Sequence, residues 1–193
     1  MDLASQYRGL ARYNAWMNER LYALSATLTE DERQRDRGAF FGSIHGTLGH
    51  ILLADRAWLW RFTRDPEIAE SRDAEGRPIP VTGRLDQTLY ARFEDLRRER
   101  TRTDGAISAW VATLDARALA APLSYRTSKG EACEHPLWWA VTHFFNHQTH
   151  HRGQVTTLLV QAGHDPGVTD LIALLRAEGG PPAQRSFTAS QGR

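Results

Sequence analysis

The spacing of apolar residues near the start of the chain limits the folds that are open to it. From residue 3 to residue 28, apolar side chains recur at alternating intervals of three and four residues. That period places them on one face of an α-helix, and other elements must then cover this face. Asp2 precedes the pattern and can cap the first turn. The stripe consists of Leu3, Tyr7, Leu10, Asn14, Met17, Leu21, Leu24 and Leu28.

Asn14 is the one polar member of the stripe, and it has two readings. It either fixes the packing register of the helix or lies near a polar pocket. Three later segments are also long and helical in pattern, over residues 43–62, 86–114 and 136–162. The second helix is apolar on more than one side and therefore buried on more than one side. Asp55 falls within its main apolar face, so we expect a buried carboxylate with a partner.

Proline and glycine mark the ends and connections of these helices. Pro136 can occupy the first position of the fourth long helix, and Gly163 can end it. Residues 64–83 carry several prolines and glycines among charges, which is typical of a loop. Residues 121–134 can form a small hairpin around Gly130. Thr169 or Asp170 can cap a short last helix that runs to about residue 176.

These elements predict an all-α fold, a four-helix bundle with a short extra helix near the C-terminus and a small hairpin. Residues 1–178 form one metal-binding domain in this interpretation. Residues 179–193 are rich in Gly, Pro, Ser and Gln, and we expect a mobile tail there.

The composition excludes several classes of protein. A formal net charge of +1 argues against nucleic-acid binding, which usually needs a basic domain or stripe. Cys133 is the single cysteine, so no internal disulfide can form, and a reducing cytoplasm is the expected location. The first residues lack the basic and apolar regions of a signal peptide. No stretch approaches the roughly 18 apolar residues of a membrane span.

The histidines are concentrated on the fourth long helix, which carries His143, His147, His150 and His151. His147 and His151 are one turn apart and differ by about 40° around the axis, so their imidazoles can converge on one ion. The alternative is a set of core histidines bonded to backbone and water. His143 lies about 12 Å along the axis from His151, too far to share an ion. His150 is better explained as a supporting or structural residue.

A catalytic zinc-type centre needs a third protein ligand and an open position. The candidates are His45 and His50 on the second helix, and spacing alone does not decide between them. His45 lies at the edge of the main apolar face. His50 lies roughly opposite the centre of that face, with the small residues Gly46 and Ala54 nearby. Imidazole ligands suit zinc, nickel, iron or copper.

Three segments resemble the DinB/YfiT-like superfamily, whose members are regarded as metalloenzymes. The resemblance extends over most of the chain, and the third segment is the most specific. The segments are Tyr13-Asn14-Ala15-Trp16-Met17-Asn18-Glu19, then Gly46-Thr47-Leu48-Gly49-His50-Ile51 with Asp55 and Trp58-Leu59, then His147-Gln148-Thr149-His150-His151-Arg152-Gly153-Gln154.

The resemblance implies a bundle of variant up-down topology and a metal held by His50, His147 and His151. By the same analogy one divalent transition metal ion per chain is expected, with zinc or nickel favoured and iron as a further option. It also implies a homodimer, for which Trp138 and Phe145 are candidate interface residues.

Some relatives look like transferases or isomerases that use a low-molecular-weight thiol, and this activity is favoured over hydrolysis by analogy. No residue can be assigned as a general base, and no motif positions Cys133 as a nucleophile. One alternative is a non-catalytic metal-binding or stress-response protein that forms a helical dimer. Another is a helical dimerisation module with histidines in its core and no metal.

Overall fold

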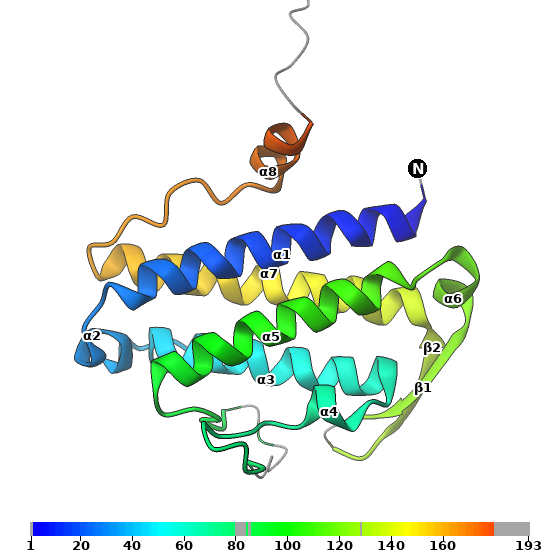
Figure 1. The fold of residues 1–193 in the computed structure, drawn as a ribbon, viewed down its shortest axis with the longest axis horizontal. Coiled ribbons are helices and arrows are strands. Elements are labelled where there is room, and N and C mark those ends of the chain that lie inside the picture. The colour runs from blue at the N-terminus through cyan, green and yellow to red at the C-terminus, as the bar shows by residue number, and fades with distance from the viewer. Residues whose placement is uncertain (1, 80–83, 85, 128, 180–193) are drawn as a thin grey trace, which may run out of the picture.

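The computed structural model describes residues 2–79, 84, 86–127 and 129–179. Of the predicted tail at 179–193, all but Gly179 lies outside the described residues. Four long helices dominate the described residues (Figure 1). The elements are α1 (Leu3–Ala26), α2 (Glu30–Gln34), α3 (Ile44–Thr63), α4 (Pro66–Ala69), α5 (Phe93–Ala112), α6 (Ala116–Ala120), β1 (Pro122–Arg126), β2 (Ala132–Pro136), α7 (Leu137–Gln161) and α8 (Leu171–Glu178).

The predicted helix ends are formed by local hydrogen bonds. Asp2 Oδ1 accepts a bond of 2.7 Å from the backbone N–H of Ser5 and so caps α1. At the end of α7, Gly163 has a φ of +86°, and the N–H of His164 donates to the carbonyl of Leu159 at 2.9 Å. This left-handed glycine satisfies carbonyls that would otherwise be left open, as the sequence predicts.

The third long helix is shorter than the sequence predicts. It begins at Phe93 rather than Asp86, and it ends at Ala112, two residues before the predicted end at Leu114. Before Phe93, the carbonyl of Tyr90 accepts a bond of 2.7 Å from His45 Nε2, so it is not engaged in a helical ladder. The long-range contact therefore overrides the local apolar pattern.

The small hairpin is confirmed, and it changes the start of the fourth long helix. Strands β1 and β2 pair antiparallel, with Leu123 opposite His135 and Tyr125 opposite Cys133. Gly130 in the connecting turn has a φ of +84°. Pro136 ends β2 and forms the N-cap of α7, so this helix begins one residue later than predicted.

The four long helices form a bundle in which neighbours do not simply alternate in direction. Helix α1 packs against α5 and α7, and α3 packs against the same two helices. Figure 1 shows that α3 and α5 run in one direction while α1 and α7 run in the other. The long connection from residue 64 to residue 92 makes the parallel α3–α5 arrangement possible. This is the predicted variant of an up-down bundle.

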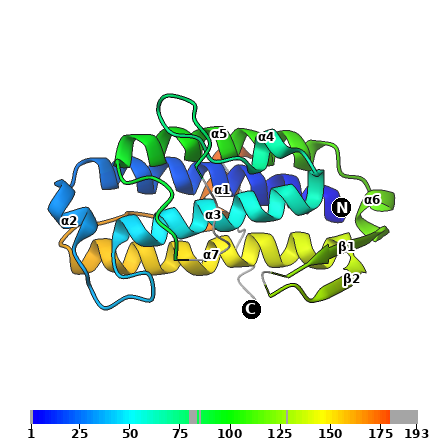
Figure 2. The same cartoon turned by 90° about the horizontal axis from the view of Figure 1, so that it is seen from below.

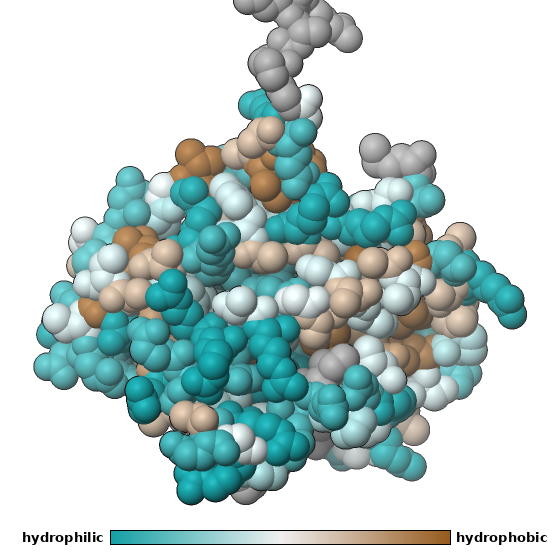
Figure 3. All heavy atoms as spheres, in the orientation of Figure 1, coloured by the Kyte–Doolittle hydropathy of each residue, from teal (hydrophilic) through white to brown (hydrophobic). Residues whose placement is uncertain are grey.

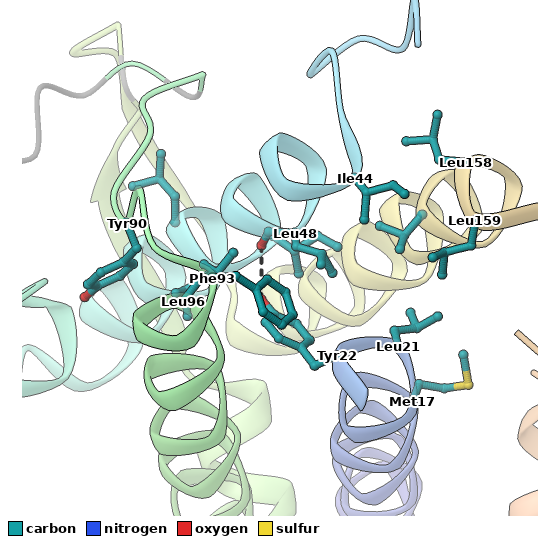
Figure 4. Close-up of a cluster of buried hydrophobic side chains, with 14 of the residues drawn as sticks. Met17, Leu21, Tyr22, Ile44, Leu48, Tyr90, Phe93, Leu96, Leu158 and Leu159 are labelled. Atoms are coloured by element: carbon teal, nitrogen blue, oxygen red, sulfur yellow. Dashed lines mark hydrogen bonds between the residues drawn. The ribbon is translucent and has the colours of Figure 1, made fainter. Parts of the chain in front are cut away.

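Two apolar clusters fill the interior, one toward each end of the bundle. One is drawn in Figure 4, where all four long helices contribute side chains, among them Leu21 of α1, Leu48 of α3, Leu96 of α5 and Leu159 of α7. The other lies toward the hairpin end and includes Ile107, Val141 and Phe144. Figure 2 shows α2 at one end of the bundle and α6 with the hairpin at the other.

Phe145 belongs to the second apolar cluster, where it stacks on Tyr7 with ring centroids 6.1 Å apart. It is therefore a core residue and does not lie on a free face, unlike the expectation for a dimer interface. Trp138 and Trp139 are exposed at the start of α7. On the face drawn in Figure 3, hydrophilic side chains predominate, and apolar patches lie between them. Among the described residues, no helix has both the length and the apolar character needed to cross a bilayer.

A buried polar network separates the two apolar clusters. Asp55 of α3 accepts 2.6 Å and 2.9 Å hydrogen bonds from Arg100 of α5 and Gln148 of α7. Arg100 also lies 2.9 Å from Asp104, which in turn accepts a bond of 2.9 Å from Asn18 of α1. The sequence predicted a partner for the buried Asp55 carboxylate, and the structure shows that its charged partner is Arg100. Both residues belong to a network that spans the bundle.

Asn14 connects the network to the fourth long helix. Its Nδ2 donates to Asp104 at 3.0 Å, and its Oδ1 accepts a hydrogen bond from Arg152 of α7. These bonds to α5 and α7 agree with a role of Asn14 in the packing register. A network joining all four helices fixes their relative height, because a one-turn slip would leave several buried charges without partners.

Gly46, in the first turn of α3, allows the preceding loop to pass close to the helix. A Cβ at this position would lie 2.2 Å from the carbonyl oxygen of Phe41. A Gly46→Ala substitution must therefore displace the loop, and we expect it to lower the free energy of unfolding by about 1–3 kcal/mol in urea titrations. Gly49 is a matched control, because a Cβ there meets nothing within 4 Å. Gly49→Ala should stabilise the helix by up to about 1 kcal/mol. Equal effects of the two substitutions would contradict this packing account.

Asp104 should make stability depend on pH. Burial raises its pKa from 3.8 to about 6, against the opposing effect of Arg100. The folded state then binds more protons than the unfolded state between about pH 4 and pH 6, so stability falls as the pH rises through this range.

Urea titrations of the wild type and of Asp104→Asn at several pH values test this expectation. Relative to the variant, the wild type should lose on the order of 2–3 kcal/mol between pH 4 and pH 7. A stability difference that stays constant with pH would contradict the prediction.

Candidate metal centre

The structure brings together His50 of α3 and the pair His147 and His151 of α7. The two helices run antiparallel, and His50 faces the pair across their interface. One ligand nitrogen from each of the three rings lies within 4.8 Å of the other two. His147 Nε2 is 3.3 Å from His50 Nε2 and 3.1 Å from His151 Nε2. The i,i+4 spacing on one helix thus meets a third imidazole from another.

These separations fit a shared metal ion. Two nitrogens bound to one zinc ion at about 2.0–2.1 Å in a tetrahedral arrangement lie about 3.3–3.4 Å apart. The two measured Nε2 separations are 3.3 Å and 3.1 Å. Three imidazoles make a donor set that suits zinc, nickel, iron or copper. The residues present therefore fit a divalent transition metal.

Gln154 fixes which nitrogen of His151 faces the group. Its Oε1 lies 2.7 Å from His151 Nδ1 and can only accept, so Nδ1 carries the proton. In the neutral ring, Nε2 then presents a lone pair toward His147 Nε2. His147 Nε2 lies close to Nε2 of both His50 and His151. A single proton on His147 Nε2 cannot form good hydrogen bonds to both of these nitrogens. An ion between the three nitrogens would accept all three lone pairs at once.

The electrostatics keep the paired histidines neutral. Burial lowers the pKa of His147 to about 3, and repulsion from His151 and His50 adds to the effect. Burial also lowers the pKa of His151, although the hydrogen bond to Gln154 opposes the shift. Both imidazoles are thus neutral near pH 7, with one ring nitrogen unprotonated in each. The neutral imidazole is the form that binds a metal.

Phe41 covers the group from the loop before α3. Its ring stacks on His50 with centroids 3.8 Å apart and an angle of 15° between the planes. The same ring meets His151 edge-on, at 5.5 Å. Phe41 is placed by the turn at Gly42, whose φ is +72°, and by the close approach of its carbonyl to Gly46. An aromatic ring on two imidazoles limits their movement and excludes water from one side.

The remaining histidines of α3 and α7 lie outside the group of three. His45 is buried and turned toward Tyr90, whose carbonyl lies 2.7 Å from its Nε2. His143 is exposed and contacts His147 and Trp58, with ring centroids 5.8 Å and 5.2 Å away. Periodicity left His45 and His50 open, and in the structure only His50 approaches the pair.

His150 is exposed beside the group. Its ring centroid is 4.7 Å from that of His151, and its Nε2 is 3.4 Å from Gln154 Nε2. It therefore contacts the residue that orients His151, and no ligand atom of His150 joins the three-histidine group.

Among the described residues, no carboxylate joins the three-histidine group. Asp55 lies on the same helix as His50, but Arg100 and Gln148 already occupy both of its oxygens. It therefore serves to hold α3 against α5 and α7. Gln148 directly follows His147 in the sequence. Its hydrogen bond to Asp55 therefore also fixes where His147 and His151 lie along the axis of α3.

Sequence reasoning missed Phe41, and it placed Gln154 in the most specific matched segment without giving it a role. Phe41 lies in a short loop without periodicity, and only the glycines on either side of the loop hint at tight turns. Gln154 shares the polar face of α7, but the role of its side chain depends on the rotamer of His151. The signal for Gln154 is its position at i+3 from a ligating histidine, within hydrogen-bonding reach on a helix.

Comparisons with known proteins place the chain in a family. The chain is 22% identical to "Protein DinB" of Bacillus subtilis (strain 168) over 161 residues, which are 83% of this chain and 88% of that protein. The DinB family model matches residues 4–186. Because this match extends over nearly the whole chain, the protein belongs to the DinB family.

Proposed function

We propose that this DinB-family protein binds one divalent transition metal ion through His50, His147 and His151. The observation that carries the proposal is the convergence of three imidazole nitrogens, two pairs of which are 3.3 Å and 3.1 Å apart. The neutrality of His147 and the fixed tautomer of His151 support it. Zinc and nickel are the favoured metals, with iron as a further option.

We further propose a metal-dependent transfer or isomerisation reaction that uses a low-molecular-weight thiol. A divalent ion held by three neutral ligands keeps its full positive charge and can bind and activate a thiolate. Asp55 is already engaged by Arg100 and Gln148, so it is not available as a general base for hydrolysis. Activation of a thiol by metal charge needs no such base. The family resemblance supports the same choice.

A homodimer and a cytoplasmic location complete the proposal. Trp138 and Trp139 are large apolar side chains exposed at the start of α7, and they could be covered in a dimer. The presence of one cysteine, Cys133, and therefore of no internal disulfide, is the support for a reducing compartment.

Metal content tests the ligand set directly. Elemental analysis of the purified wild type should find about one transition metal ion per chain, since three neutral ligands suffice for a stable site. His50→Ala, His147→Ala and His151→Ala should each lose the metal. His143→Ala and His150→Ala are matched controls from α7 and should keep it. A wild type that stays metal-free after dialysis against zinc and nickel would contradict the proposal, as would metal retained in His147→Ala.

Gln154 should affect affinity rather than stoichiometry. Gln154→Ala removes the acceptor that orients His151, and we expect metal affinity to fall by about 10- to 100-fold. Competition with a chromogenic chelator measures this change. Asn146→Ala, at an exposed position on the same helix, should leave affinity unchanged. Equal affinities for the wild type and Gln154→Ala would show that the 2.7 Å contact with His151 does not support metal binding.

A further inference from the structure

A cavity of about 1130 Å³ lies between α3, α4 and the β1–β2 hairpin. Figure 1 shows the hairpin alongside the C-terminal half of α3, with α4 near the same end. Apolar walls come from Leu53, Ala57 and Trp60 of α3, and Tyr125 lies on the hairpin side. A volume of this order is enough for a small organic molecule.

The charged groups at the cavity are predominantly arginines, and most of them already have partners. Arg56 donates to Ser71 and Tyr90 and pairs with Glu99. Arg64 donates to the carbonyl of Ser124 at 2.8 Å. These hydrogen bonds therefore hold the walls of the cavity together.

Arg126 and the two glutamates of the lining are also engaged. Arg126 donates to the carbonyl of Gly130 at 2.8 Å. Glu70 pairs with Arg72, and Glu134 accepts a hydrogen bond of 2.6 Å from Ser124. The cavity thus has more positive than negative charge, and neither acidic residue neutralises Arg61.

Arg61 differs from the other arginines of the lining. Its guanidinium carbon lies 4.6 Å from the ring centroid of Trp58 and 5.3 Å from that of Tyr125. Within the described part of the chain, it donates no hydrogen bond and has no carboxylate within 4 Å. Stacking uses the faces of a guanidinium, whereas its N–H groups point outward in the plane. A half-buried arginine is thus held by aromatic rings with its donors unused.

Burial of Arg61 carries an energetic cost that an anion would offset. Its side chain is only partly exposed, and burial lowers its pKa. A carboxylate or similar oxyanion can accept two parallel hydrogen bonds from a guanidinium, and these charge-assisted bonds are among the strongest in proteins. The apolar and aromatic walls would cover the organic part of such a ligand.

We propose that this cavity binds a small organic anion. Arg61 binds the negative group of the ligand, and Leu53, Ala57, Trp60 and Tyr125 cover its apolar part. The inference goes beyond the proposed metal function and does not require it. The two sites are nonetheless neighbours, since Trp58 contacts both Arg61 and His143, and His143 contacts His147.

Two fluorescent probes with the same ring system test the proposal. 1-Anilinonaphthalene-8-sulfonate is an apolar anion, and N-phenyl-1-naphthylamine is its uncharged analogue. The wild type should bind the anionic probe, and Arg61→Gln should weaken that binding about tenfold or more while leaving the neutral probe within about twofold. Arg61→Lys keeps the charge but loses the planar pair of donors, so its affinity for the anion should lie between those of the wild type and Arg61→Gln.

Two further variants control for site and for general charge. Ala57→Trp should fill the cavity and weaken both probes, which locates them there. Arg35→Gln removes an exposed arginine at the end of α2, at the opposite end of the bundle from the hairpin, and should change neither. Circular dichroism confirms that each variant is folded.

No binding of the anionic probe to the wild type would overturn the proposal. Unchanged binding in folded Arg61→Gln would also overturn it, as would unchanged binding of both probes in Ala57→Trp. None of these measurements uses metal content, so this proposal and the metal proposal can fail separately.

Discussion

The arrangement of the bundle depends on the hydrogen bonds that the buried carboxylate of Asp55 accepts. It joins α3 to α5 through Arg100 and to α7 through Gln148. Arg100 also pairs with Asp104, and Asp104 accepts a hydrogen bond from Asn18 of α1. Apolar side chains at helical spacing can pack at several heights, since one Leu substitutes for another. Charged groups buried with fixed partners cannot, because a slip leaves a charge unpaired in a medium that solvates it poorly.

This constraint determines where the histidines meet. Gln148 follows His147 directly, and Asp55 lies on the helix that carries His50. When Asp55 and Gln148 bond at 2.9 Å, His50 and His147 come within 3.3 Å across the α3–α7 interface. The polar network thus contributes to the alignment of two antiparallel helices. The same burial that orders these residues keeps His147 neutral, with a pKa of about 3.

Much of the fold could be predicted from residue spacing. The stripe beginning at Leu3, the cap at Asp2 and the stop at Gly163 depend on local chemistry and occur in the structure as expected. The early start predicted for the third helix was wrong because Tyr90 bonds to His45, which is 45 residues away. Phe145 was misplaced for a related reason, since periodicity identifies apolar faces but not which of two faces turns inward.

The candidate site was predictable only in part. The i,i+4 spacing of His147 and His151 is a local property and correctly brings their imidazoles together. His50 could not be separated from His45 by spacing, and the resemblance to a family supplied the choice that the geometry now favours. Phe41 acts through a loop conformation that no pattern in the chain indicates, and the position of Gln154 at i+3 from His151 does not by itself give the rotamer through which Gln154 acts.

X-ray absorption spectroscopy of the metal-loaded protein tests the central claim most directly, because it identifies the atoms bound to the ion. The account predicts scattering from three imidazole rings, with nitrogens at about 2.0–2.1 Å for zinc and at least one additional oxygen from an open position. A spectrum with fewer than three imidazoles, or with Cys133 sulfur bound to the metal in place of a histidine, would contradict it.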